Sequence, residues 1–373
     1  MKAKITVSVF VFLLGAITIV NLVLPPRAYS ENENRYLAQM PVFSASNLFK
    51  GSYTEDFESY ITDQFAFRDT WVGIKTLSEQ ALQKKDSGGV YFAKDRYLIE
   101  MFDTVDQNQF QRNLEHVAQF TQRMEETRQI FVTTMLVPTA SAVYRDKLPP
   151  FAPEVDQDAL YEQAAAALPR MVDVRAVFSS HLDEYLYYRT DHHWTTLGCY
   201  YAYAHWRAET GMQAKPADWY QQQVLSDRFF GTTYSKASSY TAQPDTILAF
   251  TPGDGNSFTV SYNNGERETD TLYERGFLSK KDKYSVFLNG NQPLTKITSQ
   301  NKNGKKLLLI KDSYANAFAP FAANDFEEVF LVDLRHYKSS VSTLISEQGI
   351  TDVLILYNMK GFASDTNLYQ LKQ

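Results

Sequence analysis

A chain of 373 residues is long enough for one large domain or two smaller ones, and its 44% hydrophobic content is sufficient for a buried core. The net charge of -6, with no basic stripe along the chain, argues against a nucleic-acid partner. The single cysteine, Cys199, excludes a disulfide within the chain and a cysteine-rich zinc site.

The N-terminus carries an almost unbroken apolar run from Ile5 to Leu24, preceded by two lysines and ended by Pro25. A helix of this length spans about 30 Å, enough for a bilayer core, and the lysines favour a cytoplasmic N-terminus. We therefore expect residues 1–28 to form a cytoplasmic tip and an uncleaved transmembrane signal anchor. Residues 28–30, Ala-Tyr-Ser, are a poor cleavage site, and a cleaved secretory signal is the alternative. Both alternatives place the following domain outside the cytoplasm; the anchor makes it a single-pass protein of the cell membrane.

For residues 29–87 we expect a tether followed by a pair of helices that lead into the main domain. The tether is polar and proline-containing, whereas residues 51–86 carry apolar side chains at helical spacing. Gly88-Gly89 breaks this pattern, so we place the start of the main domain at residue 88 and its end at residue 373.

Strand and helix patterns alternate through the main domain. Such alternation predicts an α/β fold with a mostly parallel central sheet and helices on both faces. After a hairpin at 90–99, we expect strands at 130–137, 171–177, 185–189, 306–310, 329–332 and 353–357, and helices at 110–128, 157–168, 314–323 and 341–348, with another helix capped by Thr195 or Thr196. Residues 240–300 are rich in Thr, Ser, Asn and Gly, and we expect a β-rich insertion there, such as a lid or a substrate-facing hairpin.

A serine follows one of these strands. In Lys311-Asp312-Ser313 the apolar strand ends and a helix is expected to begin at about Ser313. Ligands of α/β proteins bind at this edge of the sheet, and a helix N-terminus can stabilise an oxyanion. Asp312 and Ser313 are also common helix caps, so this segment alone favours a structural role.

A carboxylate and two imidazoles lie together in Asp191-His192-His193-Trp194. A serine nucleophile needs a base, and a histidine oriented by a carboxylate is the usual one. Asp191 and His193 are two positions apart and point the same way in an extended segment, so they are the better pair, with His192 pointing away. A capping aspartate with ordinary histidines is one alternative. A metal site of Asp191, His192, His193 and His205 is another, although adjacent histidines rarely ligate one ion.

These segments resemble the DHHW family, named after the Asp-His-His-Trp motif, which is similar to the SGNH hydrolase-like proteins that O-acetylate alginate. In that group Asp-x-His-Trp precedes a Gly-Asp-Ser-type block, the reverse of the order in ordinary SGNH esterases. The resemblance covers most of the chain beyond the anchor. Its supporting segments are Asp63 to Asp69, Gly89-Val90-Tyr91, Phe230-Gly231-Thr232 and Val332 to Arg335.

The resemblance implies that Ser313 is the nucleophile, His193 the base and Asp191 the orienting carboxylate, with no cofactor. Lys311 departs from the family pattern because it replaces the glycine before Asp312, and we expect it to make the approach to Ser313 more crowded and more cationic. The oxyanion or substrate-binding candidates are Asn358, Asn291 with its neighbour Gly290, and Arg335. Each of them is equally well explained as a turn or surface residue.

The resemblance also implies a membrane-anchored O-acyltransferase or esterase that acts on acetyl groups of a cell-surface polysaccharide. Such proteins work beside a membrane-bound O-acyltransferase, the expected partner. The sequence does not distinguish transfer from hydrolysis. The alternative is a non-catalytic glycan-binding or assembly module on the same scaffold.

Overall fold

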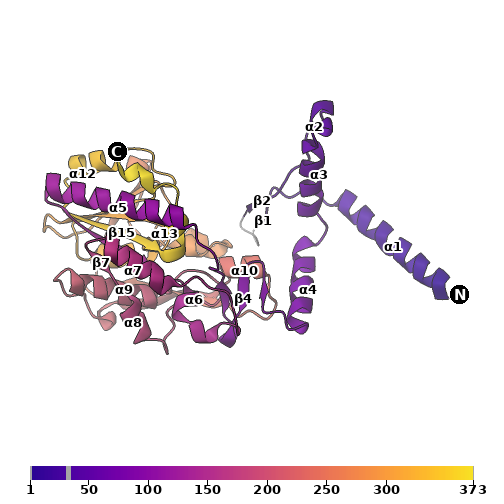
Figure 1. Ribbon diagram of the computed structural model, residues 1–373, viewed down its shortest axis with the longest axis horizontal. Helices are drawn as coiled ribbons and strands as arrows, with labels where there is room; N and C mark the ends of the chain where they lie inside the picture. The colour runs from indigo at the N-terminus through magenta and orange to yellow at the C-terminus, as the bar shows by residue number, and fades with distance from the viewer. Residues whose placement is uncertain (1, 31–34, 373) are drawn as a thin grey trace. The chain divides into compact units, whose positions relative to one another are not determined.

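The computed structural model describes residues 2–30 and 35–372, so residues 31–34 of the predicted tether lie outside the described part (Figure 1). The chain divides into two compact units. Unit 1 comprises the residues up to 88 together with 234–241, and unit 2 comprises 89–233 together with the residues from 242 onward.

Unit 1 is mainly helical. Its first helix, α1 (Lys2–Val23), includes a segment from Lys4 to Val23 that is long and apolar enough to cross a membrane. A helix of this kind near the N-terminus fits a membrane anchor and a signal sequence equally well. The predicted helix pair is present as α3 (Ser52–Asp63) and α4 (Arg68–Ala81). The remaining elements are β1 (Tyr29–Ser30), β2 (Arg35–Tyr36), α2 (Ala45–Phe49) and β3 (Asp86–Ser87).

The centre of unit 2 is an eight-stranded sheet in the order β11-β10-β12-β14-β13-β15-β6-β7. The five strands from β14 to β7 are parallel, and β12, β10 and β11 continue the sheet antiparallel at one side. The predicted mostly parallel α/β sheet is therefore confirmed. The strands are β6 (Phe131–Val137), β7 (Met171–Val172), β10 (Thr259–Tyr262), β11 (Arg267–Thr269), β12 (Leu294–Thr298), β13 (Lys306–Lys311), β14 (Glu328–Val332) and β15 (Asp352–Asn358).

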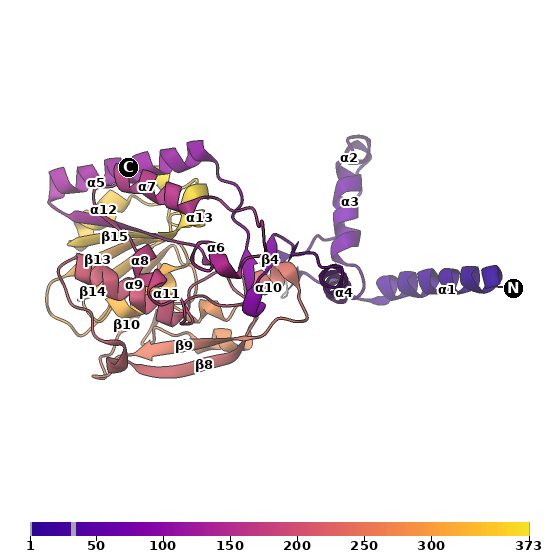
Figure 2. The same ribbon diagram turned by 60° about the horizontal axis from the view of Figure 1, so that its bottom comes forward.

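Helices cover both faces of this sheet, which gives three layers (Figure 2). Successive residues of β13 show why: Leu307 and Leu309 pack into one apolar cluster, Leu308 and Ile310 into the other. A strand that is buried on both faces requires such a continuous apolar run. One face carries α5 (Gln107–Arg128), α7 (Gln157–Ala167), α12 (Val341–Gln348) and α13 (Met359–Ser364); the other carries α8 (Arg175–Ser179), α9 (Thr196–Glu209) and α11 (Ala315–Ala322).

The region 240–300 is β-rich, as predicted, but its strands are distributed differently. Strands β10, β11 and β12 extend the central sheet, because β14 offers them an edge to pair with. The fourth strand, β9 (Asp245–Thr251), pairs with β8 (Gln221–Phe229), which the sequence patterns did not predict. The hairpin predicted at 90–99 is present as β4 (Val90–Phe92) and β5 (Leu98–Glu100). Short helices α6 (Ala140–Val143) and α10 (Thr232–Ala237) complete the main elements.

One strand prediction was too long and another was wrong. The strand predicted at 171–177 ends at Val172, and helix α8 begins at Arg175. The segment 185–189 forms a loop with one isolated bridge, from Tyr187 to Trp194. Both segments contribute apolar side chains to the core cluster, among them Val174 and Leu186. The spacing of apolar residues in the sequence does not distinguish such packing from strand pairing.

Candidate active site

Strand β13 carries Ser313 to the carboxyl edge of the sheet. Lys311 is the last strand residue, and the Asp312 N–H donates to the Leu356 carbonyl of the neighbouring strand β15 at 3.2 Å. Helix α11 begins at Ala315, two residues later than predicted, so Ser313 lies in the turn between strand and helix. Its side chain is half-buried.

Asp191 and His193 lie in a loop that ends where Thr195 caps helix α9, as predicted. A buried carboxylate outside the predicted set, Asp245 of β9, holds this loop. It accepts hydrogen bonds from the N–H groups of Arg189 and Thr190, both at 2.8 Å, and from the Thr190 hydroxyl at 2.5 Å. The loop conformation therefore depends on a side chain more than 50 residues away in the chain.

The structure brings Ser313, His193 and Asp191 together in one hydrogen-bonded chain. His193 Nδ1 lies 2.5 Å from Asp191 Oδ1, and His193 Nε2 lies 2.7 Å from Ser313 Oγ. The other carboxylate oxygen, Oδ2, accepts from the Thr232 N–H at 2.7 Å and from its hydroxyl at 3.1 Å. An acid, a base and a hydroxyl are thus within hydrogen-bond reach of one another, as nucleophilic catalysis requires.

Burial and neighbouring charges set the protonation of this pair. Burial and the adjacent His192 lower the pKa of His193 to about 4, although Asp191 acts in the opposite direction. Burial alone would raise the pKa of Asp191, but the two imidazoles and the Thr232 N–H hold it well below its usual range. At neutral pH the pair is therefore a carboxylate and a neutral imidazole. Since the carboxylate only accepts, His193 Nδ1 carries the proton and Nε2 accepts from Ser313.

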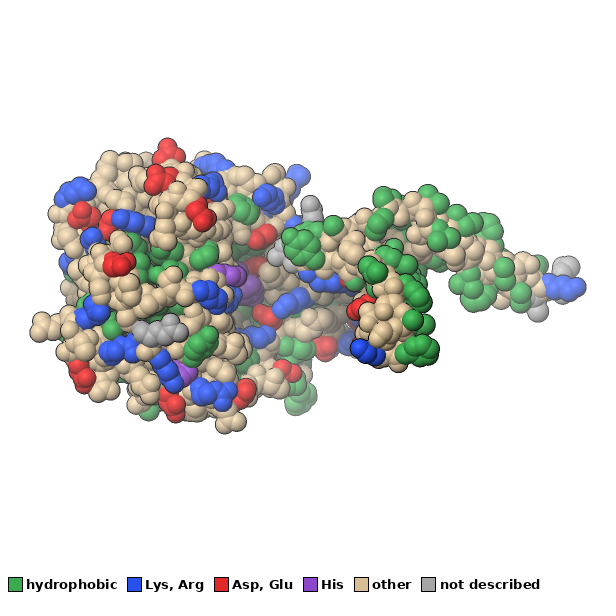
Figure 3. Space-filling model, turned by 90° about the horizontal axis from the view of Figure 1, so that it is seen from above, with side chains coloured by type: hydrophobic (Ala, Val, Ile, Leu, Met, Phe, Trp, Pro, Cys, Tyr) green, Lys and Arg blue, Asp and Glu red, His purple; other side chains and the backbone are tan. Residues whose placement is uncertain are grey.

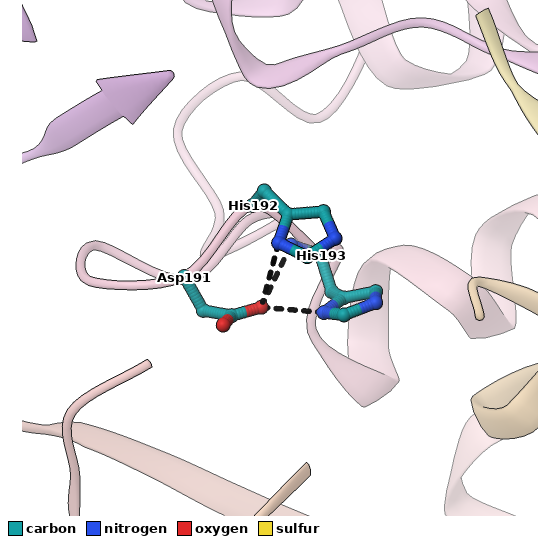
Figure 4. A group of neighbouring side chains, drawn as sticks. All are labelled: Asp191, His192 and His193. Carbon is teal, nitrogen blue, oxygen red and sulfur yellow. Dashed lines mark hydrogen bonds and ion pairs between the residues drawn. The ribbon is translucent and has the colours of Figure 1, made fainter. Parts of the chain in front are cut away.

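His192 does not point away, as the extended-segment argument predicted. Its ring centroid lies 3.9 Å from that of His193, its Nδ1 is 2.6 Å from the Thr232 hydroxyl, and both histidines reach toward Asp191 (Figure 4). The prediction was wrong because residues 189–193 form a bend rather than an extended strand.

Aromatic residues surround the histidine. The Tyr284 ring stacks on the His193 imidazole at 3.7 Å between centroids and 8° between planes, and its hydroxyl donates to the Ser313 carbonyl at 3.4 Å. The Trp194 indole N–H donates to the Tyr314 carbonyl at 3.1 Å, and the Tyr314 hydroxyl donates to the His192 carbonyl. The tryptophan of the motif therefore joins the histidine loop to the serine turn.

The three oxyanion candidates are each bonded to other groups. Asn358 donates through its side-chain amide to Asp312 at 2.6 Å and accepts from the Gly361 N–H at 2.8 Å, which caps α13. It also lines a cavity of about 20 Å³ together with Asp191. Asn291 accepts from Lys311 Nζ at 2.9 Å, and Arg335 forms a two-bond pair with Asp333.

Lys311 does not make the approach to Ser313 cationic, contrary to expectation. The side chain is buried, and its ammonium group donates to Asn291 and to Asn316 at 2.7 Å, with Asp333 at 3.8 Å. Burial lowers the pKa of Lys311 to about 8. Its long side chain is held in the core beside α11, where it bonds to Asn316.

The metal alternative retains three of its four residues. Asp191, His192 and His193 each offer one donor atom within 4.8 Å of the others, whereas His205, on helix α9, is not in this group. The hydrogen-bonded arrangement also includes Ser313, whose hydroxyl lies 2.7 Å from His193 Nε2.

Two further residues position the carboxylate. Thr232 supplies two of its hydrogen bonds, and a Cβ at Gly231 would lie 2.1 Å from Asp191 Oδ2, so only glycine fits there. Both lie in Phe230-Gly231-Thr232, a segment that contributed to the family resemblance, but the sequence alone did not reveal what it contacts.

Comparisons with known proteins agree with this fold. The DHHW protein family matches residues 152–332, which include all three residues of the hydrogen-bonded chain, and confirms the predicted resemblance. A DHHW family protein from Eubacterium siraeum is similar in structure, with a TM-score of 0.66 and 26% identity over 77% of this chain and 96% of that chain.

Two structures of Bacillus cereus PatB1, one with a sulfonyl adduct, have TM-scores of 0.63 and 0.61. Their identities are 20% and 22%, and they cover 76% and 74% of this chain and 100% and 97% of their own, so they support the fold alone. A comparison with curated proteins finds no match. Together the structures confirm the predicted α/β fold class.

Proposed function

We propose that this protein is a serine-dependent enzyme that transfers an acyl group, with Ser313 as nucleophile, His193 as general base and Asp191 as the orienting carboxylate. The observation that carries the proposal is the position of His193, whose two ring nitrogens lie 2.5 Å from Asp191 and 2.7 Å from Ser313. A hydroxyl becomes nucleophilic only when a base in this position removes its proton.

The reaction has two halves. Ser313 Oγ attacks the carbonyl carbon of the donor while its proton passes to His193 Nε2. His193 then gives this proton to the departing oxygen, and the acyl group remains as an ester on Ser313. In the second half a sugar hydroxyl or a water gives its proton to His193 and attacks the ester, and the proton finally returns to Ser313. Transfer and hydrolysis differ only in this acceptor.

The donor, acceptor and location are proposed on the sequence resemblance to DHHW and alginate O-acetylation proteins. We propose an acetyl group, a polysaccharide of the cell surface, and a membrane-bound O-acyltransferase as the partner that delivers the acetyl group. The apolar helix α1 supports anchoring of an extracytoplasmic domain beside such a partner, because tethering raises the local concentration of enzyme at its donor.

A non-catalytic glycan-binding or assembly module is the second candidate. The observation that favours it is that Asn358 and Arg335 already donate, to Asp312 and to Asp333. An acyl-transferring site needs donors aimed at the oxyanion, and a scaffold does not.

The test uses the full chain in lipid nanodiscs with a sulfonyl fluoride, which labels activated serines, and an acetyl ester reporter. We expect labelling of the peptide that contains Ser313, and loss of labelling and ester turnover in Ser313→Ala and His193→Ala. The exposed Ser346→Ala and His336→Ala serve as matched controls and should behave like the wild type. A folded wild type that is neither labelled nor active would contradict the proposal and favour the scaffold.

A further inference from the structure

Large apolar side chains are exposed mainly in unit 1, although unit 2 is the larger unit. The exposed ones in unit 2 are scattered: Phe131, Phe151, Leu182, Met212, Val224 and Tyr369. Outside α1, the exposed ones in unit 1 include a row that begins at the turn before α4 and runs along that helix: Phe67, Trp71, Ile74, Leu77 and Leu82. We call these five residues the α4 stripe. Figure 3 shows hydrophobic side chains over the helices of unit 1.

The three members of the α4 stripe within the helix follow the helical period: spacings of three residues keep Trp71, Ile74 and Leu77 on one face. Phe67 precedes the first residue of α4, and Leu82 follows the last. Phe67 is 65% exposed and Leu82 is 83% exposed. Single exposed apolar residues are common on protein surfaces, but several large ones along one helix indicate a contact surface.

The opposite face of α4 is the one that packs against protein. Gly73 lies against the Tyr240 ring, where a Cβ would be 2.3 Å from the nearest ring atom, and the Thr76 hydroxyl donates to the Ala237 carbonyl at 2.7 Å. A helix on a protein core normally buries its apolar face. Here segment 234–241 covers the small and polar face, and the apolar face is left outward.

Hydrogen bonds join the start of α4 to the end of α1. The Asn21 side chain, in the last turn of α1, accepts from the Ala66 N–H at 2.7 Å. The Gln64 amide forms two bonds at 2.8 Å with the backbone of Arg27, just after the helix. If α1 spans a bilayer, these bonds hold the turn before α4, with Phe67, at the level where the chain leaves the membrane.

We infer that the α4 stripe lies in the interfacial layer of the lipid bilayer, next to the membrane span formed by α1. Aromatic and aliphatic side chains on an amphipathic helix are suited to that layer. The Trp71 indole N–H already donates to the Ala66 carbonyl at 3.1 Å, so its ring enters an apolar layer without an unpaired donor. The inference rests on the proposed membrane anchor and adds a second, surface-lying contact to it.

The test uses the full chain in nanodiscs whose lipids carry bromine high on the acyl chains. The Trp71 emission is obtained as the difference between the wild type and Trp71→Phe, and Trp206→Phe provides the same difference for a tryptophan buried in the core of unit 2. We expect bromolipid to remove most of the Trp71 emission and to leave the Trp206 emission unchanged, with acrylamide from the water quenching Trp71 weakly.

Three results would overturn the inference. Strong acrylamide quenching without bromolipid quenching would place the stripe in water, and protection from both quenchers would indicate a protein contact instead of lipid. A chain that leaves the bilayer after cleavage of α1 would remove its basis. Sulfonyl labelling of Ser313 in the same nanodiscs tests the proposed enzyme separately. If Ser313 is labelled but bromolipid does not quench Trp71, only the inference about the α4 stripe is refuted.

Discussion

Gly231→Ala tests whether the position of the Asp191 carboxylate matters for the chemistry. Gly231 precedes Thr232, whose N–H and hydroxyl bind Asp191 Oδ2. A Cβ at Gly231 would lie 2.1 Å from Asp191 Oδ2 and 2.3 Å from Asp191 Cβ, where ordinary contacts begin at 3.4 Å. The backbone angles of Gly231 lie outside the left-handed region, so the change adds a clash without backbone strain.

The size of the clash sets the expected loss. Restoring a 3.4 Å contact from 2.1 Å requires a shift of about 1.3 Å, and a shift of that size can break the 2.5 Å bond to His193. Misplacement by about 1 Å can cost about 10²-fold in rate, and loss of the orienting carboxylate about 10⁴-fold. We therefore expect kcat/KM of Gly231→Ala to fall between about 10²-fold and 10⁴-fold, with stability reduced by about 1–3 kcal/mol from overpacking.

The assay is turnover of the acetyl ester reporter and the rate of sulfonyl labelling, with thermal unfolding to verify the fold. Gly276→Ala is the matched control, because nothing lies within 4 Å of a Cβ built there, and it should be neutral. Combining Gly231→Ala with Asp191→Asn should cost little beyond the worse single change, since both act on one interaction. A folded Gly231→Ala protein with wild-type activity would refute the reasoning.

Four further predictions concern the same site and the loop that holds it. Because burial and His192 lower the pKa of His193 to about 4, activity should fall as pH falls through about 4 rather than through 6.5, and an acid limb near 6.5 in the pH–rate profile would contradict this. The same shift should make the stability contribution of His193 complete above pH 6.5 and lost as pH falls toward 4, as measured by unfolding. Tyr284→Ala should lower kcat/KM about tenfold by removing the ring stacked on His193, whereas Tyr284→Phe should stay near wild type; equal losses would assign the effect to the hydroxyl. Asp245→Ala should lower the free energy of unfolding by about 2–4 kcal/mol and reduce activity, because buried N–H groups of the histidine loop lose their acceptor; unchanged unfolding would contradict this.

Much of the architecture could be predicted from the sequence because strands and helices follow from the local spacing of apolar residues. Apolar runs at strand length and apolar residues at helical spacing indicated β6, β13, β14 and β15 and the helices between them, and Thr195 marked the start of α9. The length of the apolar run predicted α1. These features depend on neighbours within one or two helical turns, so a single sequence contains them.

The residues of the hydrogen-bonded chain could also be named in advance: a carboxylate two positions before a histidine indicated Asp191 and His193, and the family resemblance added Ser313, whose own segment favoured a helix cap. Their distance from each other was not contained in the sequence. Ser313 meets His193 because β13 and the loop before α9 reach the same edge of the sheet, and Trp194 binds the serine turn there. The catalytic roles of the three residues remain a prediction.

Only the tertiary structure decided which polar groups are already bonded to others. It committed Asn358 to Asp312 and buried Lys311 beside Asn316, and it turned His192 toward the carboxylate. The Lys311 and Asn358 bonds join residues 5 and 46 positions apart, and His192 is held by Thr232, 40 positions away, so packing of the whole domain sets this geometry. The residue type of a side chain determines which bonds it can make, and the fold determines which of them it makes.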